Sequence, residues 1–112
     1  MSEAEVLLVI TNVPDRATAE RVAEALVTNG VAACINILAE CTSVYQWEGK
    51  LNHTSEVPLL IKTTRAAYAR LESALRELHP YELPELIAVP VTAGLPAYLN
   101  WVVQETQPRI TE

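Results

Sequence analysis

The sequence is poor in glycine and in basic residues, and each shortage excludes a class of function. Three glycines in 112 residues are too few to form the glycine-rich loop that cradles a phosphate. Eight lysines and arginines stand against fourteen acidic residues without forming a cluster, and the formal net charge is −6. Because nucleic acids and anionic membranes attract basic patches, neither is an expected partner.

Long hydrophobic runs are also missing. No apolar run approaches the ~20 residues that a helix needs to span a bilayer. Residues 1–5 are acidic, whereas an export signal begins with basic residues and continues into a longer apolar stretch. From these features we expect a cytoplasmic protein.

Cysteine is scarce, with only Cys34 and Cys41 in the chain. Two scattered thiols do not form a disulfide framework, and there is no Cys-x-x-Cys or closely spaced histidine pair to indicate a preformed structural metal site. The two cysteines are seven positions apart, so on an unbroken strand they would face opposite sides, and a bulge would reverse this.

Apolar residues, in contrast, make up half of the chain. A length of 112 residues is typical of one domain, here residues 1–112, with a real hydrophobic core. The apolar share is high for so small a domain, so some apolar surface must be covered by another molecule. Self-association is the simplest way to cover it.

Hydrophobic periodicity predicts the order strand–helix–strand–strand–helix–strand, followed by a short helix. The expected strands are residues 6–10, 31–38 continued by 42–47, 51–63 and 86–92. The first helix is expected to start after Asp15 and to end at Asn29-Gly30, and the second to end near His79. The short last helix is expected to run from Pro96 to about Glu105. With right-handed crossovers this order predicts an α+β, ferredoxin-like βαββαβ fold. Both main helices then lie on one face of an antiparallel sheet, and the other face is open.

The second and third strands form a predicted hairpin of unusual length around the turn Glu48-Gly49-Lys50. Pro58 in the returning arm cannot donate a ladder hydrogen bond, so that strand must be bulged or unpaired on one side there. A two-stranded arm is marginally stable in water. We therefore interpret Tyr45 and Trp47 as anchors of an interface between copies. Pro90 near the end of the last strand indicates an edge strand.

Several segments, taken in order, resemble the CutA divalent-cation-tolerance family. They are Thr11-Asn12-Val13-Pro14, Ala32 to Ile37, Ser43 to Lys50, Lys62-Thr63, His79 to Glu85, and Tyr98 with Trp101. The resemblance implies a ferredoxin-like trimer similar in architecture to the PII signalling proteins, with hairpins that reach across neighbouring subunits. It also implies a role in tolerance to divalent metals, copper in particular, and no established chemical reaction. Eukaryotic members are linked with membrane anchoring of an esterase.

One segment departs from the family pattern. Many relatives carry a Pro-Gly break where this chain has Leu38-Ala39-Glu40-Cys41, so the second strand is expected to bend less sharply. Cys41 is not typical of the family, and its role stays open.

Cys34 and His79 are the candidate metal ligands. Cys34 matches the position most often discussed as a ligand in the family, and a thiolate suits Cu(I) or Zn(II). The alternative is a small buried hydrophobe in the middle of a strand. His79 precedes a proline at a helix end, where it either caps the last carbonyls or binds metal.

A proline-stiffened loop carries Tyr81, Glu82 and Glu85. Together with Lys62 these residues are the candidate small-molecule or cation site, in a cleft between subunits. The alternative is that Glu82 and Glu85 pair with Lys62 or with an arginine of a neighbouring subunit.

Together with what the resemblance implies, these residues favour a non-enzymatic homotrimer that binds copper, another divalent cation or a small effector, with no organic cofactor. The alternative is a PII-like signalling scaffold that binds a metabolite in clefts between subunits. A small phosphatase-type enzyme ranks far below, because the chain has no nucleophile elbow and no His-Glu-x-x-His motif.

Overall fold

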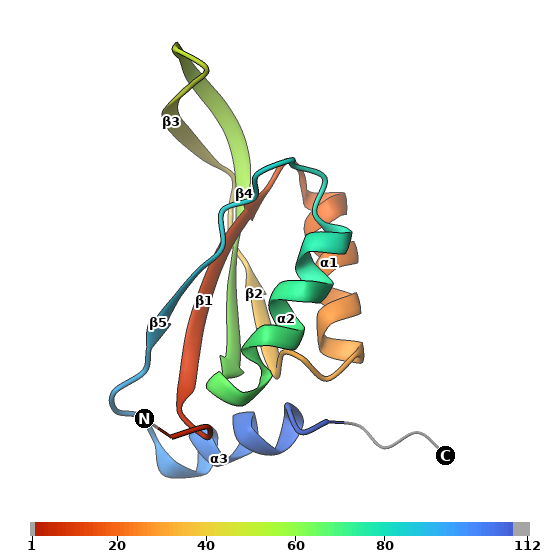
Figure 1. The fold of residues 1–112 in the computed structure, drawn as a ribbon, viewed down its shortest axis with the longest axis vertical. Coiled ribbons are helices and arrows are strands. Elements are labelled where there is room, and N and C mark those ends of the chain that lie inside the picture. Colours follow the sequence, from red (N-terminus) through yellow and green to blue (C-terminus); the bar gives the residue numbers. More distant parts are fainter. Residues whose placement is uncertain (1, 109–112) are drawn as a thin grey trace.

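The computed structural model describes residues 2–108 and places an antiparallel sheet at the centre of the fold (Figure 1). The sheet has the order β2-β4-β1-β5, with β1 at Val6–Val13, β2 at Cys34–Ile37, β4 at Lys50–Thr64 and β5 at Ile87–Pro90. The apolar run that begins at Val6 thus forms a central strand, as its composition predicts. β5 pairs only with β1 and is an edge strand, which confirms the interpretation of Pro90.

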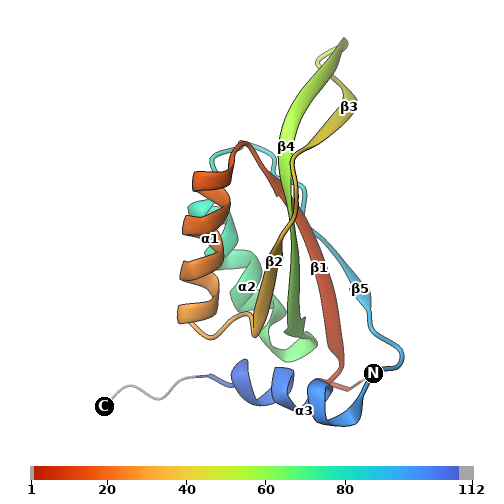
Figure 2. The ribbon, with the colours of Figure 1, turned by 180° about the vertical axis from the view of Figure 1, so that it is seen from behind.

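Two helices, α1 (Arg16–Thr28) and α2 (Arg65–Leu78), cover one face of this sheet (Figure 2). Between the helices and the sheet lies the main core, whose largest side chains are fully buried. They include Leu26 from α1, Leu71 and Leu75 from α2, and Leu59 and Ile61 from β4. Among residues 2–108 no helix has the length and apolar character needed to cross a membrane.

The helices begin and end where the sequence predicts. The Asp15 carboxylate accepts a hydrogen bond of 2.8 Å from the Thr18 N–H, and this bond lowers the pKa of Asp15. Gly30 follows α1 with a φ of 74°, a conformation that favours glycine. At the end of α2 the His79 N–H donates to the Leu75 carbonyl at 2.8 Å.

β3 (Cys41–Trp47) and the first half of β4 form an arm that projects from the sheet (Figure 1). Glu48 and Gly49 both have positive φ, 53° and 79°, so the two-residue turn is of type I′. The radius of gyration is 14.8 Å. A compact chain of this length would have ~13 Å. The projecting arm accounts for the larger value.

A one-residue bulge separates β2 from β3. Ile37 pairs with Leu59 and Cys41 pairs with Glu56, so residues 38–40 oppose residues 57–58 on β4. The bulge lies at Pro58, where the missing N–H predicted an interruption. Because of the extra residue, Cys34 and Cys41 lie on the same face of the ladder.

Two predicted strands are shorter than expected. β2 begins at Cys34 because the Val31 N–H still bonds the Leu26 carbonyl at 3.2 Å and so belongs to the end of α1. β5 runs from Ile87 to Pro90, and only Val91 adds a further bond to β1, at 2.9 Å to the Val6 carbonyl. Proline cannot donate to the ladder, and the regular pairing of β5 ends with Pro90.

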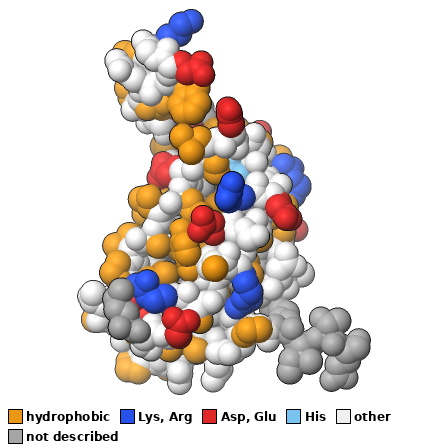
Figure 3. Space-filling view, viewed as in Figure 1, with side chains coloured by type: hydrophobic (Ala, Val, Ile, Leu, Met, Phe, Trp, Pro, Cys, Tyr) orange, Lys and Arg blue, Asp and Glu red, His pale blue; other side chains and the backbone are white. Residues whose placement is uncertain are grey.

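The face of the sheet opposite α1 and α2 is largely uncovered, and where β1 pairs with β5 it is apolar. The register pairs Leu8 with Val89 and Ile10 with Ile87, so these four side chains share that face. Ile87 is 52% and Val89 45% exposed. In the view of Figure 3, hydrophobic side chains gather along the side of the molecule where β5 lies. We call this surface the open face.

A third helix, α3 (Pro96–Glu105), closes one end of the sheet (Figure 2). Its Val102 is fully buried in a small second core with Val6 and Ala33. The residue after the helix, Thr106, is tied to α2, since the Arg70 guanidinium donates to its carbonyl at 3.0 Å. The predicted helix from Pro96 to Glu105 is confirmed.

The α3 N-terminus lacks a capping side chain, because Leu95 occupies the N-cap position and is 71% exposed. We expect Leu95→Asp to stabilise the protein by ~1 kcal/mol, since the carboxylate can accept from free N–H groups of the first turn. Thermal unfolding should shift upward by about 4 °C. Leu95→Ala removes the same apolar side chain without adding an acceptor, and equal melting temperatures for the two variants would contradict the capping argument.

Candidate functional site

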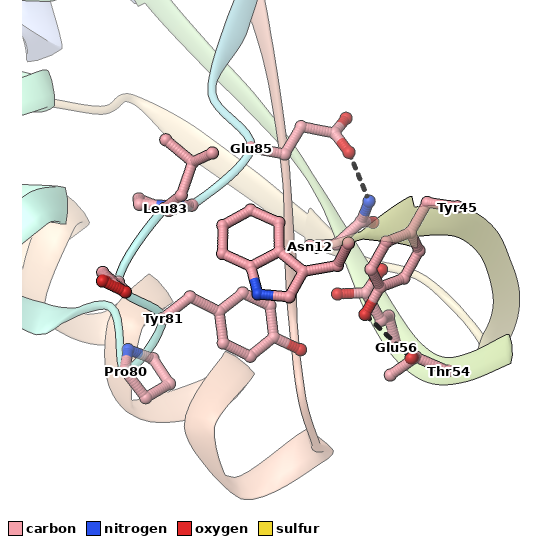
Figure 4. A pocket seen from close by; sticks show the side chains of 11 residues that line it. Asn12, Tyr45, Thr54, Glu56, Pro80, Tyr81, Leu83 and Glu85 are labelled. Carbon is pink, nitrogen blue, oxygen red and sulfur yellow. Dashed lines mark hydrogen bonds between the residues drawn. The ribbon is translucent and has the colours of Figure 1, made fainter. Parts of the chain in front are cut away.

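A cavity of about 800 Å³ lies between the hairpin arm and the loop that follows α2 (Figure 4). This volume suits a small organic molecule. The cavity is lined by Asn12 from β1, by Tyr45, Trp47, Thr54 and Glu56 from the arm, and by Pro80, Tyr81, Glu82, Leu83, Pro84 and Glu85 from the loop. We call it the arm–loop cavity.

Hydrogen bonds to the end of β1 fix the loop. The Thr11 hydroxyl donates to the Glu85 carbonyl at 2.6 Å, and the Asn12 amide Nδ2 donates to Glu85 Oε1 at 2.9 Å. Both residues belong to the ordered end of β1, so the loop wall of the cavity is held on a rigid strand. The carboxylate of Glu85 is thereby partly engaged within the chain.

His79 is buried beneath the same loop and both of its ring nitrogens have partners. Nδ1 accepts from the Tyr81 N–H at 3.2 Å, and Nε2 lies 2.8 Å from the Asn12 carbonyl. Because Nδ1 is an acceptor, the proton is on Nε2, which donates to Asn12. The side chain thus ties the loop to β1, and the capping bond at the end of α2 comes from its backbone.

Tyr81 and Glu56 face each other across the arm–loop cavity (Figure 4). Glu56 is only 7% exposed. Burial raises the pKa of Tyr81 to about 12, and the hydrogen bond to Glu56 and the negative charge of that carboxylate add to the effect. The Tyr81 hydroxyl therefore stays protonated at neutral pH, with the Glu56 carboxylate as its neighbour in the cavity. On the arm, the Tyr45 and Thr54 hydroxyls are bonded at 2.9 Å.

A second cluster surrounds Cys34 at the other end of the sheet. The Lys62 ammonium lies 3.9 Å from the Cys34 sulfur and also donates to the Asn36 side-chain oxygen. Tyr98 from α3 approaches the same thiol, since burial first, and then Cys34 by charge and hydrogen bonding, raises the pKa of Tyr98. Cys34 is half-buried and unoxidised.

The structure divides the predicted site residues between these two places. Tyr81, Glu82 and Glu85 line the arm–loop cavity, whereas Lys62 lies beside Cys34 in the second cluster. Lys62 opposes Leu8 on β1, four residues from the Asn12 that binds His79. The two candidate metal ligands are therefore ~13 Å apart along the strand.

Neither place holds a preformed multidentate metal site within one chain. Across residues 2–108, no three His, Cys, Asp or Glu side chains are grouped so that they could share an ion. Cys34 and Cys41 oppose residues of β4 that are six positions apart, Lys62 and Glu56. That separation is ~20 Å, too far for a disulfide within the chain.

Sequence reasoning missed three contributors to these sites. Glu56 carried no recognisable signal, and Tyr98 belongs to a segment that resembles the family but was not linked to Cys34, because each meets its partner only through strand pairing or helix packing. Asn12 belongs to a segment that resembles the family, but nothing in the sequence linked it to the loop. The alternation of Tyr45 and Trp47 did predict one shared side of β3, and the register confirms it.

Comparison with known proteins identifies the family. Residues 7–105 match the family model described as CutA1 divalent ion tolerance protein. The chain is 43% identical over 94 residues to Protein CutA of Mus musculus, which covers 84% of this chain and 53% of the mouse protein. The chain thus spans about half the length of that relative.

Bacterial relatives match over nearly their whole length. The divalent-cation tolerance protein CutA of Thermus thermophilus is 39% identical over 99 residues, 88% of this chain and 96% of that protein. The crystal structure of CutA from Xylella fastidiosa superposes with a TM-score of 0.89 at 42% identity and covers 92% of this chain and 99% of that one. The sequence match and the shared mixed α/β fold lead to one conclusion: the chain belongs to the CutA1 divalent ion tolerance family.

Proposed function

We propose that the protein is a non-enzymatic homotrimer of ferredoxin-like, PII-like subunits that acts in tolerance to divalent metals. The open face carries this proposal, because an apolar surface on a small chain calls for a partner. The projecting arm offers a second surface to a neighbouring subunit. The metal role follows from the family, and the cytoplasmic location remains a prediction from the sequence.

Within this function, Cys34 is the residue that we expect to hold copper. Its thiol is accessible in part, lies 3.9 Å from the Lys62 ammonium, and offers the sulfur ligand that a soft metal prefers. One chain supplies a single soft ligand at this point, so further ligands must come from other subunits or from solution. His79 would have to break two hydrogen bonds before it could bind a metal.

Replacing Cys34 with Ser should abolish stoichiometric Cu(I) binding, measured in competition with a chelator, because thiolates dominate Cu(I) affinity. Cys41→Ser, on the arm, should bind as the parent does. Circular dichroism should show the same folded state with and without copper, since the apolar core forms without metal. Undiminished binding by the Cys34 variant would move the site to Cys41 or His79.

The arm–loop cavity favours a second candidate function, a PII-like signalling scaffold that binds a small effector. The cavity is large enough for a metabolite, and rigid elements present its polar groups. If the parent protein binds no Cu(I) in the titration above, metal tolerance is an indirect consequence and the effector function takes its place.

A further inference from the structure

The arm–loop cavity carries charge of one sign. Glu56, Glu82 and Glu85 line it, and among residues 2–108 no lysine, arginine or histidine does. The negative charge of Asp15 also acts on Tyr81 from the start of α1. A phosphate or carboxylate ligand would meet only repulsion from these groups, so an anionic effector does not fit here.

Glu56 distinguishes the cavity from a cluster of exposed carboxylates, because its side chain is buried. Its side chain is 7% exposed, and no lysine or arginine within residues 2–108 forms an ion pair with it. The neighbouring Tyr81 hydroxyl is neutral, so it compensates only part of the cost of burying a carboxylate. A cation placed beside Glu56 would supply the missing charge, in surroundings where the attraction is stronger than in water.

The shape of the cavity selects among cations. A divalent metal needs several ligands that converge on one point, and residues 2–108 hold no group of three His, Cys, Asp or Glu that could do this. At about 800 Å³ the cavity is also far larger than a bare ion. The space suits a cation with an organic body.

Aromatic rings provide the surface for such a body. Tyr45 and Trp47 alternate along β3 and face the same side as Thr54 and Glu56, with 42% and 44% of their surfaces exposed. Tyr81 stands on the opposite wall, where the ring of Figure 4 points across the cavity. Aromatic faces attract ammonium groups, and the effect is largest where water is displaced.

We propose that the arm–loop cavity binds a small organic cation, an amine or a quaternary ammonium compound, between Glu56 and the rings of Tyr45, Trp47 and Tyr81. This proposal rests on the effector function proposed above and names the chemical class of the effector. It assigns the rings of Tyr45 and Trp47 to the ligand, in place of the interface between copies that the sequence suggested. Amines and quaternary ammonium ions share the charge and the apolar body, and they differ in whether they can donate hydrogen bonds to the carboxylates.

Three probes of equal length test the charge requirement: n-butylammonium, n-butanol and butyrate, titrated into the full-length protein and followed by NMR chemical shifts. We expect n-butylammonium to bind at least about tenfold more tightly than n-butanol, and butyrate not to bind. Tetramethylammonium, titrated in parallel, distinguishes a site for quaternary ammonium ions from a site for amines, because it cannot donate a hydrogen bond. Equal binding of the three butyl probes, or no binding of either cation, would overturn the proposal.

Variants locate the site. Glu56→Gln and Tyr81→Leu should each weaken n-butylammonium binding by about tenfold, because one removes the charge and the other an aromatic wall. Glu77→Gln removes an exposed carboxylate from α2, outside the cavity, and should leave binding unchanged. If Glu56→Gln does not fold, Tyr81→Leu still decides. Parental affinity in the folded variants would contradict the assignment.

The same preparations separate this proposal from the proposed function. Subunit mass by light scattering and Cu(I) binding at Cys34 depend on residues outside the cavity. A trimer that binds Cu(I) but no organic cation would overturn the ligand class alone. A monomer that binds n-butylammonium would overturn the assembly and keep the cavity.

Discussion

Val89→Asp should convert the proposed trimer of about 37 kDa into a monomer of 12.3 kDa. Val89 is 45% exposed on the open face, beside Leu8 on β1. In an assembly packed through this face, the new carboxylate would be buried without a partner, at a cost of several kcal/mol for each subunit. Because β5 is an edge strand and the side chain is exposed in the isolated chain, the subunit itself should remain folded. Multi-angle light scattering measures the mass.

Leu95→Asp is the matched control, because it introduces the same charge at an exposed leucine outside the open face. That variant should retain the mass of the parent. A Val89→Asp protein that still scatters as a trimer would place the interface elsewhere, and a monodisperse monomeric parent would refute the assembly itself.

Leu71→Ala should have the largest effect on folding, a loss of ~2–5 kcal/mol in the free energy of unfolding. Leu71 is fully buried between α2 and the sheet. The close-packed side chains around it cannot fill the cavity that the shorter alanine would leave. The free energy of unfolding of a domain of this size is ~5–15 kcal/mol in total, so the variant should unfold at a much lower denaturant concentration. Equilibrium unfolding in urea measures the difference.

Two controls accompany this measurement. Val27→Ala, at a partly exposed position of α1, should change the unfolding free energy by no more than ~0.5 kcal/mol. Total chain concentration must be held constant, because association of the folded subunits makes the apparent stability depend on it. If the two variants unfold at the same urea concentration, α2 does not pack in the main core as described.

Local chemistry alone fixed the elements of this fold. Asp15 begins a helix through a bond to Thr18, Gly30 ends one through its positive φ, and Pro80 ends one by restricting the backbone of His79, so the sequence could predict these boundaries. The turn at Glu48-Gly49 and the interruption at Pro58 are equally local. The order of the elements then indicated which face of the sheet would lack helices.

Side-chain partners from distant segments were decided only by the tertiary structure. Lys62 was expected to share a cleft between subunits with the acidic loop, and within one chain strand pairing places it beside Cys34, 28 residues away in the sequence. Glu56 meets Tyr81 because β4 extends beyond β1 and the loop after α2 folds back against it. Such contacts depend on the register in which the strands pair, and the hydrophobic periodicity of the sequence leaves that register undetermined.

The bulge shows the physical reason most directly. One extra residue between Ile37 and Cys41 turns β3 over, which brings Tyr45 and Trp47 onto the same side as Glu56. Pro58 predicted an interruption of the ladder, but it could not predict the number of residues inserted in the opposite strand. The sequence by itself determined the strands, the helices and the apolar open face, whereas the face that each arm residue presents, and with it the cavity, was decided by pairing across the sheet.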